Sequence, residues 1–294
     1  MAAALAVPAL SGCTTAVASQ SVAAAPTGAN VEWPSPPGDA RYQAGGILLT
    51  MENRISGADS EILERVLTVE APGLPAFTID AGEDTRFGPS VMVVETPAGT
   101  PMVLFQTYSG GAHCCTTINV IEPRGGRLQA TMIYEGDGGP MEDAPRDLDG
   151  DGLIDFVRYD NGFLYAFASY AESFAPPTIV NVVDGQAVDV SKRPGFRSLF
   201  EEEATRAREA CASGEGNRNG ACASFVAASA RLGRFDAAWA DMLRLYDRDS
   251  DWDWPTGCRV AATERACPED QRITYATFPE ALRAHLVALG YIAR

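Results

Sequence analysis

The stretch TTINVIEPRGGRLQATMIYE, residues 116–135, shows how most of this chain is built. Two runs rich in β-branched, apolar and aromatic side chains flank the sequence Arg124-Gly125-Gly126. Such runs are typical of strands, and glycine supplies the backbone conformations that a tight turn needs. The stretch therefore predicts an antiparallel β-hairpin.

Similar runs continue from about residue 42 to residue 190, separated by Gly, Pro and Asp. Their length and spacing indicate an all-β region in which two stretches look like variants of one antiparallel meander. Such a unit resembles one blade of a β-propeller or one bead of a related β-repeat protein. The chain before Pro101 has room for at most one more unit, which disfavours a closed propeller, and a small sandwich or an open stack of blades is equally compatible. The runs predicted as strands are GILLT, RVLTVEA, SVMVVET, PMVLFQTY, TTINVIE, LQATMIYE, IDFVRYD, FLYAFASY, TIVNVVD and AVDV.

After residue 197 the pattern changes to Ala-rich segments with apolar residues at three- and four-residue spacing, which predicts helices. We therefore expect an α+β protein, with an antiparallel β-repeat domain, propeller-blade-like or sandwich, followed by a small disulfide-stapled α-helical domain. The expected boundaries are 1–38 for an export signal and flexible tether, 39–197 for the β-rich domain and 198–294 for the helical domain. The predicted helices span 199–212, 221–232, 235–246 and 280–289.

Charge and composition narrow the class of protein. The chain has 294 residues and 46% hydrophobic character, enough for two domains that each bury a core. Asp and Glu outnumber Lys and Arg by 39 to 23, a net charge of −16. This net negative charge repels nucleic acid and anionic lipid surfaces, so no nucleic-acid partner is expected.

The N-terminal segment predicts export, because no charged residue precedes Glu32. Within it, Leu10-Ser11-Gly12-Cys13 resembles the lipobox of bacterial lipoproteins, and this resemblance implies that Cys13 carries a lipid anchor. Simple secretion, with cleavage after Ala18 or near Ala25, is the alternative. Either way we expect a periplasmic or cell-surface location, with membrane contact only through the lipid anchor.

Cysteine usage agrees with export. Apart from Cys13 the chain has six cysteines, an even number in a compartment where disulfides persist. The C-terminal four fall into two short loops, although four cysteines allow three connectivities. The expected pairs are Cys211 with Cys222 and Cys258 with Cys267.

The sequence DLDGDGLID, residues 147–155, predicts a calcium site. Its aspartates at positions 1, 3, 5 and 9 bring several carboxylates into one small volume, and Ca²⁺ takes six to eight oxygen ligands. Gly152 supplies the sharp bend. Leu153 is expected to offer its backbone carbonyl, with its side chain free to enter the core beside Ile154 or Phe156. The predicted carboxylate ligands are Asp147, Asp149, Asp151 and Asp155.

The site is not an EF-hand, because Arg158 stands where that motif has its closing Glu. The loop instead resembles the calcium loops of the FG-GAP and VCBS repeat families, which lead into a strand as DLDGDGLIDF leads into VRYD. This resemblance implies that calcium organises a β-blade or bead, in proteins that serve adhesion and extracellular recognition. A solvated loop without an ion, and an ion that acts as a switch or direct ligand bridge, are the alternatives.

A second unusual feature is the sequence GGAHCC, which contains His113, Cys114 and Cys115. Three interpretations stay open. The cysteines form a disulfide with each other or with other segments, or His113 and the thiolates hold a soft metal such as copper or zinc, or a Cys–His pair acts as a nucleophile. The other histidine, His285, is expected at a surface or interface.

These features predict an extracytoplasmic, calcium-stabilised binding or structural module of the bacterial cell envelope. Its expected cofactor is Ca²⁺, and its expected partner is another envelope protein or a glycan. No catalysis is predicted, since the chain contains no G-x-S-x-G, H-E-x-x-H, P-loop or dinucleotide motif. The alternative is an envelope enzyme, or a redox or metal-binding protein, with its site at His113, Cys114 and Cys115.

Overall fold

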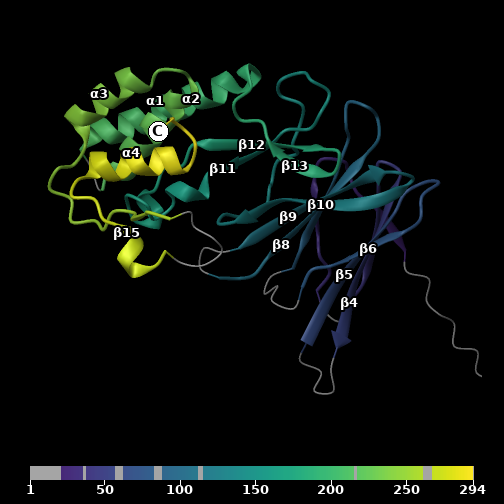
Figure 1. Ribbon diagram of the computed structural model, residues 1–294. Coiled ribbons are helices and arrows are strands. Elements are labelled where there is room, and N and C mark those ends of the chain that lie inside the picture. Colours follow the sequence, from purple (N-terminus) through teal and green to yellow (C-terminus); the bar gives the residue numbers. More distant parts are fainter. Residues whose placement is uncertain are drawn as a thin grey trace, which may run out of the picture.

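The structure is a computed structural model that describes residues 21–35, 38–56, 62–82, 88–111, 115–214, 217–260 and 267–293. Within these residues, three β-sheets formed by β1 to β13 come before the four α-helices in the chain, which confirms the mixed α+β class (Figure 1). None of the sheets in this part of the chain closes, and they form no propeller. A propeller is therefore not formed by the described residues, and the sheets stack face to face as open layers through apolar cores.

Two five-stranded sheets form the N-terminal part of the molecule. The first has the order β1-β3-β4-β5-β6 and the second the order β10-β9-β8-β7-β2. The hairpin predicted at residues 116–135 is β9–β10, with Arg124 opposite Arg127 beside the turn. The first sheet's strands are β1 (Val22–Ala24), β3 (Ala40–Ala44), β4 (Ile47–Ser56), β5 (Ile62–Glu70) and β6 (Phe77–Asp80), and the second's are β2 (Asn30–Glu32), β7 (Ser90–Val94), β8 (Met102–Tyr108), β9 (Thr116–Arg124) and β10 (Arg127–Gly136).

The second sheet is buried on both faces. On β8, Val103 and Phe105 point into the core shared with the first sheet. Met102 and Leu104 alternate with them and face a different core. An antiparallel strand usually has one apolar and one polar face, so burial of both faces explains why PMVLF is a continuous apolar run.

A smaller third sheet covers the far face of the second one. It contains β11 (Phe156–Tyr159), β12 (Pro177–Val183) and β13 (Gln186–Asp189). Phe156 packs with residues of the second sheet, and Ile179 of β12 belongs to the core of the helical part. The molecule is therefore layered as sheet, sheet, sheet and helices (Figure 1).

The helices form the C-terminal part, and their order follows the prediction closely. A 3₁₀ helix, η3 (Pro194–Phe196), leads directly into α1.

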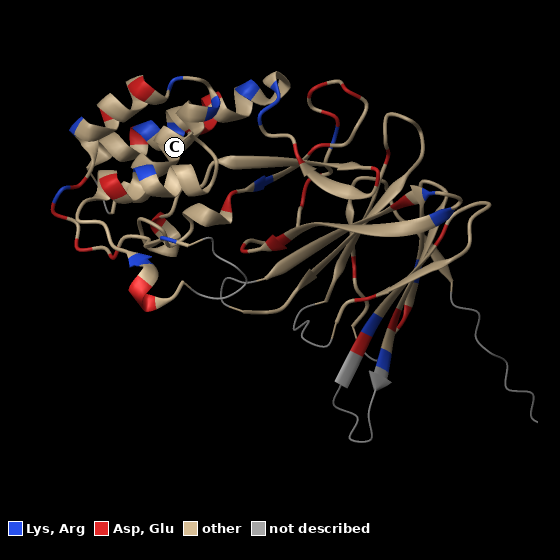
Figure 2. Cartoon of the chain, in the orientation of Figure 1, with Lys and Arg blue, Asp and Glu red and all other residues tan. Residues whose placement is uncertain are grey.

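No helix in the described part of the chain is long and apolar enough to cross a membrane. Figure 2 shows acidic and basic positions interspersed over these helices. The four helices are α1 (Arg197–Ser213), α2 (Asn219–Arg231), α3 (Phe235–Leu245) and α4 (Phe278–Ala288).

Both expected C-terminal disulfides are present. Cys211 on α1 is bonded to Cys222 on α2, and both sulfur-bearing residues are fully buried. The second bond joins Cys258 to Cys267. Cys258 ends the short strand β14 (Gly257–Cys258), which pairs with β15 (Arg272–Ile273) beyond the 3₁₀ helix η4 (Glu269–Gln271).

Two local expectations are corrected. FLYAFASY, residues 163–170, is not a strand, because Phe163, Ala166 and Phe167 follow a helical spacing and all point into the helical core. They lie in the 3₁₀ helix η1 (Asn161–Phe163) and the turns before η2 (Tyr170–Glu172). Within the expected tether, residues 22–24 and 30–32 form β1 and β2, and Trp33 is buried in the core between the first two sheets. The domain boundaries themselves stay a prediction.

Candidate metal centre

The aspartate loop lies between the second and third sheets and is closed at its base. The backbone N–H of Asp155 donates to the carbonyl oxygen of Arg146 at 3.1 Å, which brings the two ends of the loop together. Phe156, the next residue, begins β11. The short bridge therefore converts the run of aspartates into a compact turn that leads into a buried strand.

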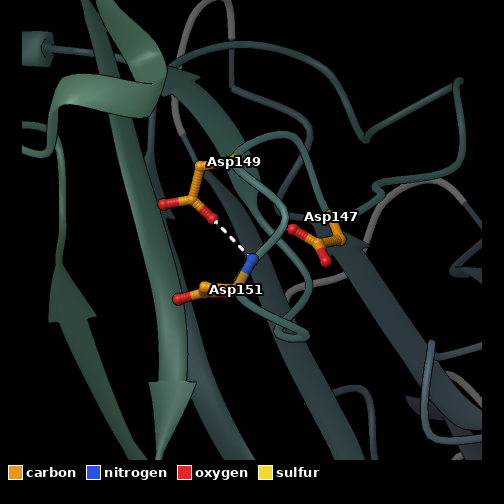
Figure 3. A group of neighbouring side chains, drawn as sticks. All are labelled: Asp147, Asp149 and Asp151. Atoms are coloured by element: carbon orange, nitrogen blue, oxygen red, sulfur yellow. Dashed lines mark hydrogen bonds between the residues drawn. The ribbon is translucent and has the colours of Figure 1, made fainter.

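Three of the predicted ligands converge in this turn. Asp147, Asp149 and Asp151 each offer a carboxylate oxygen, and these three atoms lie within 4.8 Å of one another (Figure 3). Oxygens on opposite sides of a calcium ion are about 4.6–5.2 Å apart, because each Ca–O bond is about 2.3–2.6 Å long. The spacing and the chemistry of these three donors therefore fit Ca²⁺.

The backbone of the loop orients these carboxylates. The N–H groups of Gly150 and Gly152 donate to the two oxygens of Asp147, at 2.7 and 2.9 Å. The N–H of Leu153 donates to Asp151 at 2.8 Å. Gly152 has a φ of +90°, which a residue with a Cβ adopts only with strain, and this matches the sharp bend expected there. The carboxylates are thus fixed by bonds within the turn.

Asp155 has a different environment from the other three aspartates. It is 1% exposed, and it accepts hydrogen bonds from the N–H of Leu148 at 2.7 Å and from the side-chain amide of Asn181 at 2.6 Å. Asn181 also donates to the carbonyl oxygen of Ile154 at 2.8 Å, so it ties the loop to β12. As a metal ligand, Asp155 stays a prediction.

The role of Leu153 is corrected in part. Its side chain is 36% exposed, whereas the neighbouring Ile154 and Phe156 are buried in the core between the second and third sheets. The backbone N–H bond to Asp151 holds Leu153 at the rim of the turn, which leaves the core positions to its two neighbours. Its carbonyl group as a calcium ligand stays a prediction.

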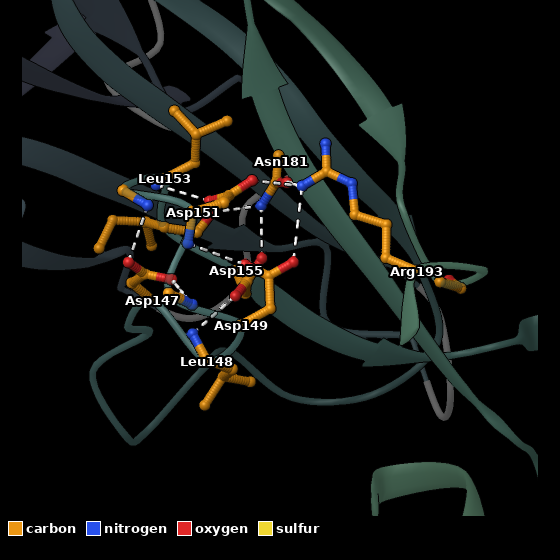
Figure 4. Close-up of polar contacts among 12 residues, drawn as sticks. Asp147, Leu148, Asp149, Asp151, Leu153, Asp155, Asn181 and Arg193 are labelled. Carbon is orange, nitrogen blue, oxygen red and sulfur yellow. Dashed lines mark hydrogen bonds and ion pairs between the residues drawn. The ribbon is translucent and has the colours of Figure 1, made fainter. Parts of the chain in front are cut away.

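A cation from outside the loop completes the cluster. The guanidinium of Arg193 contacts the Asp151 carboxylate, lies 3.7 Å from that of Asp149 and donates to the side-chain oxygen of Asn181 at 3.1 Å (Figure 4). Sequence reasoning missed Arg193 and Asn181, because both lie far along the chain and neither belongs to a motif. Their positions follow from the packing of β12 and the segment after β13 against the loop.

The loop also packs closely against the entry to the helices. A Cβ added at Gly195 would lie 2.2 Å from the Cβ of Asp149, so only glycine fits at this position of η3. Residues 193–195 lead directly into α1. The predicted metal site therefore lies where the third sheet, the loop and the start of the helical part meet.

The second predicted cluster is described only in part. His113 and Cys114 lie outside the described residues, as does Cys13. Cys115 is disulfide-bonded, and its N–H donates to the hydroxyl oxygen of Ser109 at 2.6 Å. A soft-metal, redox or nucleophilic role for this segment stays a prediction.

Comparison with known proteins gives matches of limited coverage. Residues 200–290 match the family model described as the sll0997 C-terminal domain, which spans most of α1 and all of α2, α3 and α4. The chain is 39% identical, over 65% of its length, to a Synechocystis protein described as "Probable thylakoid lumen protein sll0997", and 33% identical, over 65% of its length, to a Sinorhizobium fredii protein described as "Uncharacterized protein y4bJ". The matches cover 57% and 30% of those two relatives. No solved structure matches the chain.

Proposed function

We propose that this protein is an extracytoplasmic binding or structural module in which calcium joins the β-sheet part to the helical part. The observation that carries the proposal is the position of the three converging carboxylates. This cluster contacts Arg193 and Gly195, and those two residues belong to the segment that leads into α1. An ion held there would bind the loop and so stabilise the contact between layers that are far apart in the chain.

A location outside the cytoplasm is supported by two independent observations. The Synechocystis relative carries a name that assigns it to the thylakoid lumen, which is a compartment outside the cytoplasm. The two described disulfides, Cys211–Cys222 and Cys258–Cys267, are of the kind that persists in oxidising compartments. We extend the location to a periplasm or cell surface, and we keep lipid attachment at Cys13 as part of the proposal.

Calcium would be held by Asp147, Asp149 and Asp151, with the Leu153 carbonyl and Asp155 as the further ligands proposed. The ion would supply the positive charge that lets several carboxylates lie close together. The likeness of this loop to those of the FG-GAP and VCBS families supports the same structural role. Another envelope protein or a glycan is the proposed partner.

The guanidinium of Arg193 lowers the repulsion among the same carboxylates, so the loop retains its shape at low calcium. Arg193 is 36% exposed and its contacts with Asp149 and Asp151 are those of a partly solvated ion pair. Such pairs contribute about 1 kcal/mol or less. A divalent ion bound directly by several oxygens is expected to stabilise the loop by more than this pair does.

The test is thermal unfolding of the purified chain in calcium and in excess chelator. Calcium at about one hundred times its Kd is expected to add about 2.7 kcal/mol, or roughly 5–10 °C in Tm for a chain of this size. Asp149→Ala is expected to lose most of this gain, because alanine offers no oxygen ligand, whereas asparagine would keep one. Alanine also removes the acceptor for the Asp151 N–H at 3.2 Å, so the calcium-dependent shift of this variant is measured against its own melting temperature in chelator.

The matched control is Asp251→Ala, in another aspartate-rich segment, residues 247–253. Asp251 is exposed, and it is outside the carboxylate cluster of the described residues. This variant is expected to keep the whole calcium-dependent shift. A wild-type melting temperature that is the same in calcium and in chelator would contradict the proposal.

A further inference from the structure

A small cavity opens beside the aspartate loop and is lined in part by residues 152–154. Its volume is about 230 Å³. The walls come from four places in the chain, namely the turn between β7 and β8, the end of β9, the loop itself and the third sheet. Because drug-sized ligands occupy about 300–1,000 Å³, this cavity suits one side chain or a small molecule of similar size.

Most of the cavity wall is apolar. Met102, Ile154 and Phe156 belong to the core between the second and third sheets, and their outer edges form the floor of the cavity. Leu153, whose side chain is 36% exposed, forms the rim contributed by the aspartate loop. Val182 of β12 completes this apolar surface. An aliphatic chain could therefore be buried here with a gain in free energy.

One acidic side chain also lines the cavity. On β9 the side chains alternate between the two faces, so Glu122 follows Ile118 and Val120 on the face turned toward the third sheet. Its side chain is only 23% exposed. Burial raises the pKa of Glu122, and the nearby Arg124 opposes this shift. The strand thus places a carboxylate at the end of an apolar stripe.

This carboxylate has no hydrogen-bond donor among the residues that the structure describes. The nearest cation is Arg124, whose Nη1 lies 4.0 Å from Glu122 Oε1, at the limit of an ion pair. Arg124 instead donates through Nη2 to Gln129 at 2.6 Å, and it lies against Gly185. The ion pair with Arg124 supplies no hydrogen bond, so the Glu122 oxygens keep the capacity to accept hydrogen bonds from a second cation.

We propose that this cavity binds a primary alkylammonium group, with the aliphatic chain against Met102, Ile154 and Phe156 and the ammonium at Glu122. The net charge of −16 attracts such a ligand. The same chemistry is offered by a lysine side chain of a protein partner and by a free alkylamine. The site is separate from the carboxylate cluster, and the proposal does not depend on calcium.

The experiment is NMR titration of methyl-labelled protein, with calcium present throughout. The probes are n-butylammonium, Nα-acetyl-lysine N-methylamide (lysine diamide) as a model of a lysine side chain in a protein, and 1-butanol as a neutral ligand of similar shape. Both amines are expected to shift the methyl signals of Met102, Ile154 and Val182, and 1-butanol is expected to bind at least about 10-fold more weakly. A lysine diamide that binds as tightly as butylammonium indicates a protein partner, and binding of butylammonium alone indicates a free amine.

An isosteric variant and a charge-removing variant complete the test. Glu122→Gln is expected to weaken amine binding at least about 10-fold, because a charge-assisted hydrogen bond is lost, with little change in 1-butanol binding. Arg124→Gln removes a competing cation at the same strand end and is expected to keep or tighten amine binding. Equal amine affinity in the wild type and Glu122→Gln, or shifts that map outside the cavity, would overturn the proposal whether or not calcium binds the loop.

Discussion

At the scale of single residues, the aspartates of the loop divide into two kinds. Three of them converge at the surface of the turn, where an ion could reach them. Asp155 is buried instead, and each of its oxygens already accepts a hydrogen bond, one from the Leu148 N–H and one from Asn181. A carboxylate in this position stabilises the fold through its acceptor geometry, with or without an ion nearby.

Substitution of Asp155 by asparagine is therefore expected to act in calcium and in chelator alike. The new amide group would place a donor against either the Leu148 N–H or the Asn181 amide, and a buried donor without an acceptor costs about 1–3 kcal/mol. Urea unfolding in both conditions measures this loss. Asp184→Asn, in an exposed turn, is the control and is expected to change stability by less than about 0.5 kcal/mol. A loss seen only in calcium would show that Asp155 acts as a ligand alone.

The sequence predicted the residues of the loop but not its surroundings. The alternating aspartates and Gly152 follow from local spacing, because a tight turn of nine residues brings them together wherever it is placed. Arg193 and Asn181 depend on long-range packing and carry no local signal. Glu122 had one signal that could have been used, since it continues the alternating face of Ile118 and Val120.

At the scale of the elements, His285 of α4 packs against the segment that connects β11 to β12. His285 lies edge-on between Phe163 and Phe167, with ring centroids 5.3 and 5.2 Å away. Its Nε2 is buried and has no hydrogen-bond partner among the described residues. The expectation of a surface histidine is not met, because the aromatic residues of η1 and the following turn fold back onto α4, and a place at an interface with a partner stays a prediction.

This histidine makes stability depend on pH. Burial lowers the pKa of His285 below its ordinary value of 6.5, while a bond to the Gly162 backbone and the charge of Asp160 oppose the shift. Asp160 also accepts from the Tyr291 hydroxyl at 2.9 Å. Below about pH 6.5 the unfolded chain binds the proton more readily than the folded one, so the free energy of unfolding falls as the pH falls, until the folded-state pKa is reached.

Urea unfolding at pH 7.5 and pH 5.5 measures this dependence, whose slope is at most about 1.4 kcal/mol per pH unit for one histidine. His285→Gln is expected to lose less stability between these pH values than the wild type does. The chain has two histidines, so His113→Gln is the natural control and should retain the wild-type pH dependence. An identical loss in His285→Gln and the wild type would assign the pH dependence to other groups.

Elements with a clear period were predicted well, and those without one were not. The four helices and nine of the ten strand runs follow the spacing of their apolar residues. FLYAFASY was mistaken for a strand because its aromatic and small residues suit either state, and the helical core decides between them. The short edge strands β1 and β2 gave no periodic signal, since each has three residues and depends on the sheet beside it.

At the scale of the whole molecule, the aspartate loop lies at a meeting point of layers. Ile154 and Phe156 belong to the core between the second and third sheets, while Asp149 contacts the segment that enters α1. Strands β4 and β5 belong to the first sheet, and the second sheet lies between them and the loop (Figure 1). An ion in the loop would therefore act on two interfaces at once and leave β4 and β5 unaffected.

Hydrogen exchange can measure this spatial pattern. Calcium is expected to slow exchange at the loop amides, including those of Gly150 and Gly152, and also at residues 193–200, because a loop fixed by an ion opens less often from Arg193 and Gly195. The amides of β4 and β5 should exchange at the same rate with and without calcium. The Asp149→Ala protein is the control, because it lacks that ligand oxygen, and it should show no calcium-dependent change in any segment. Protection confined to the loop would mean that calcium stabilises the turn alone and does not join the sheets to the helices.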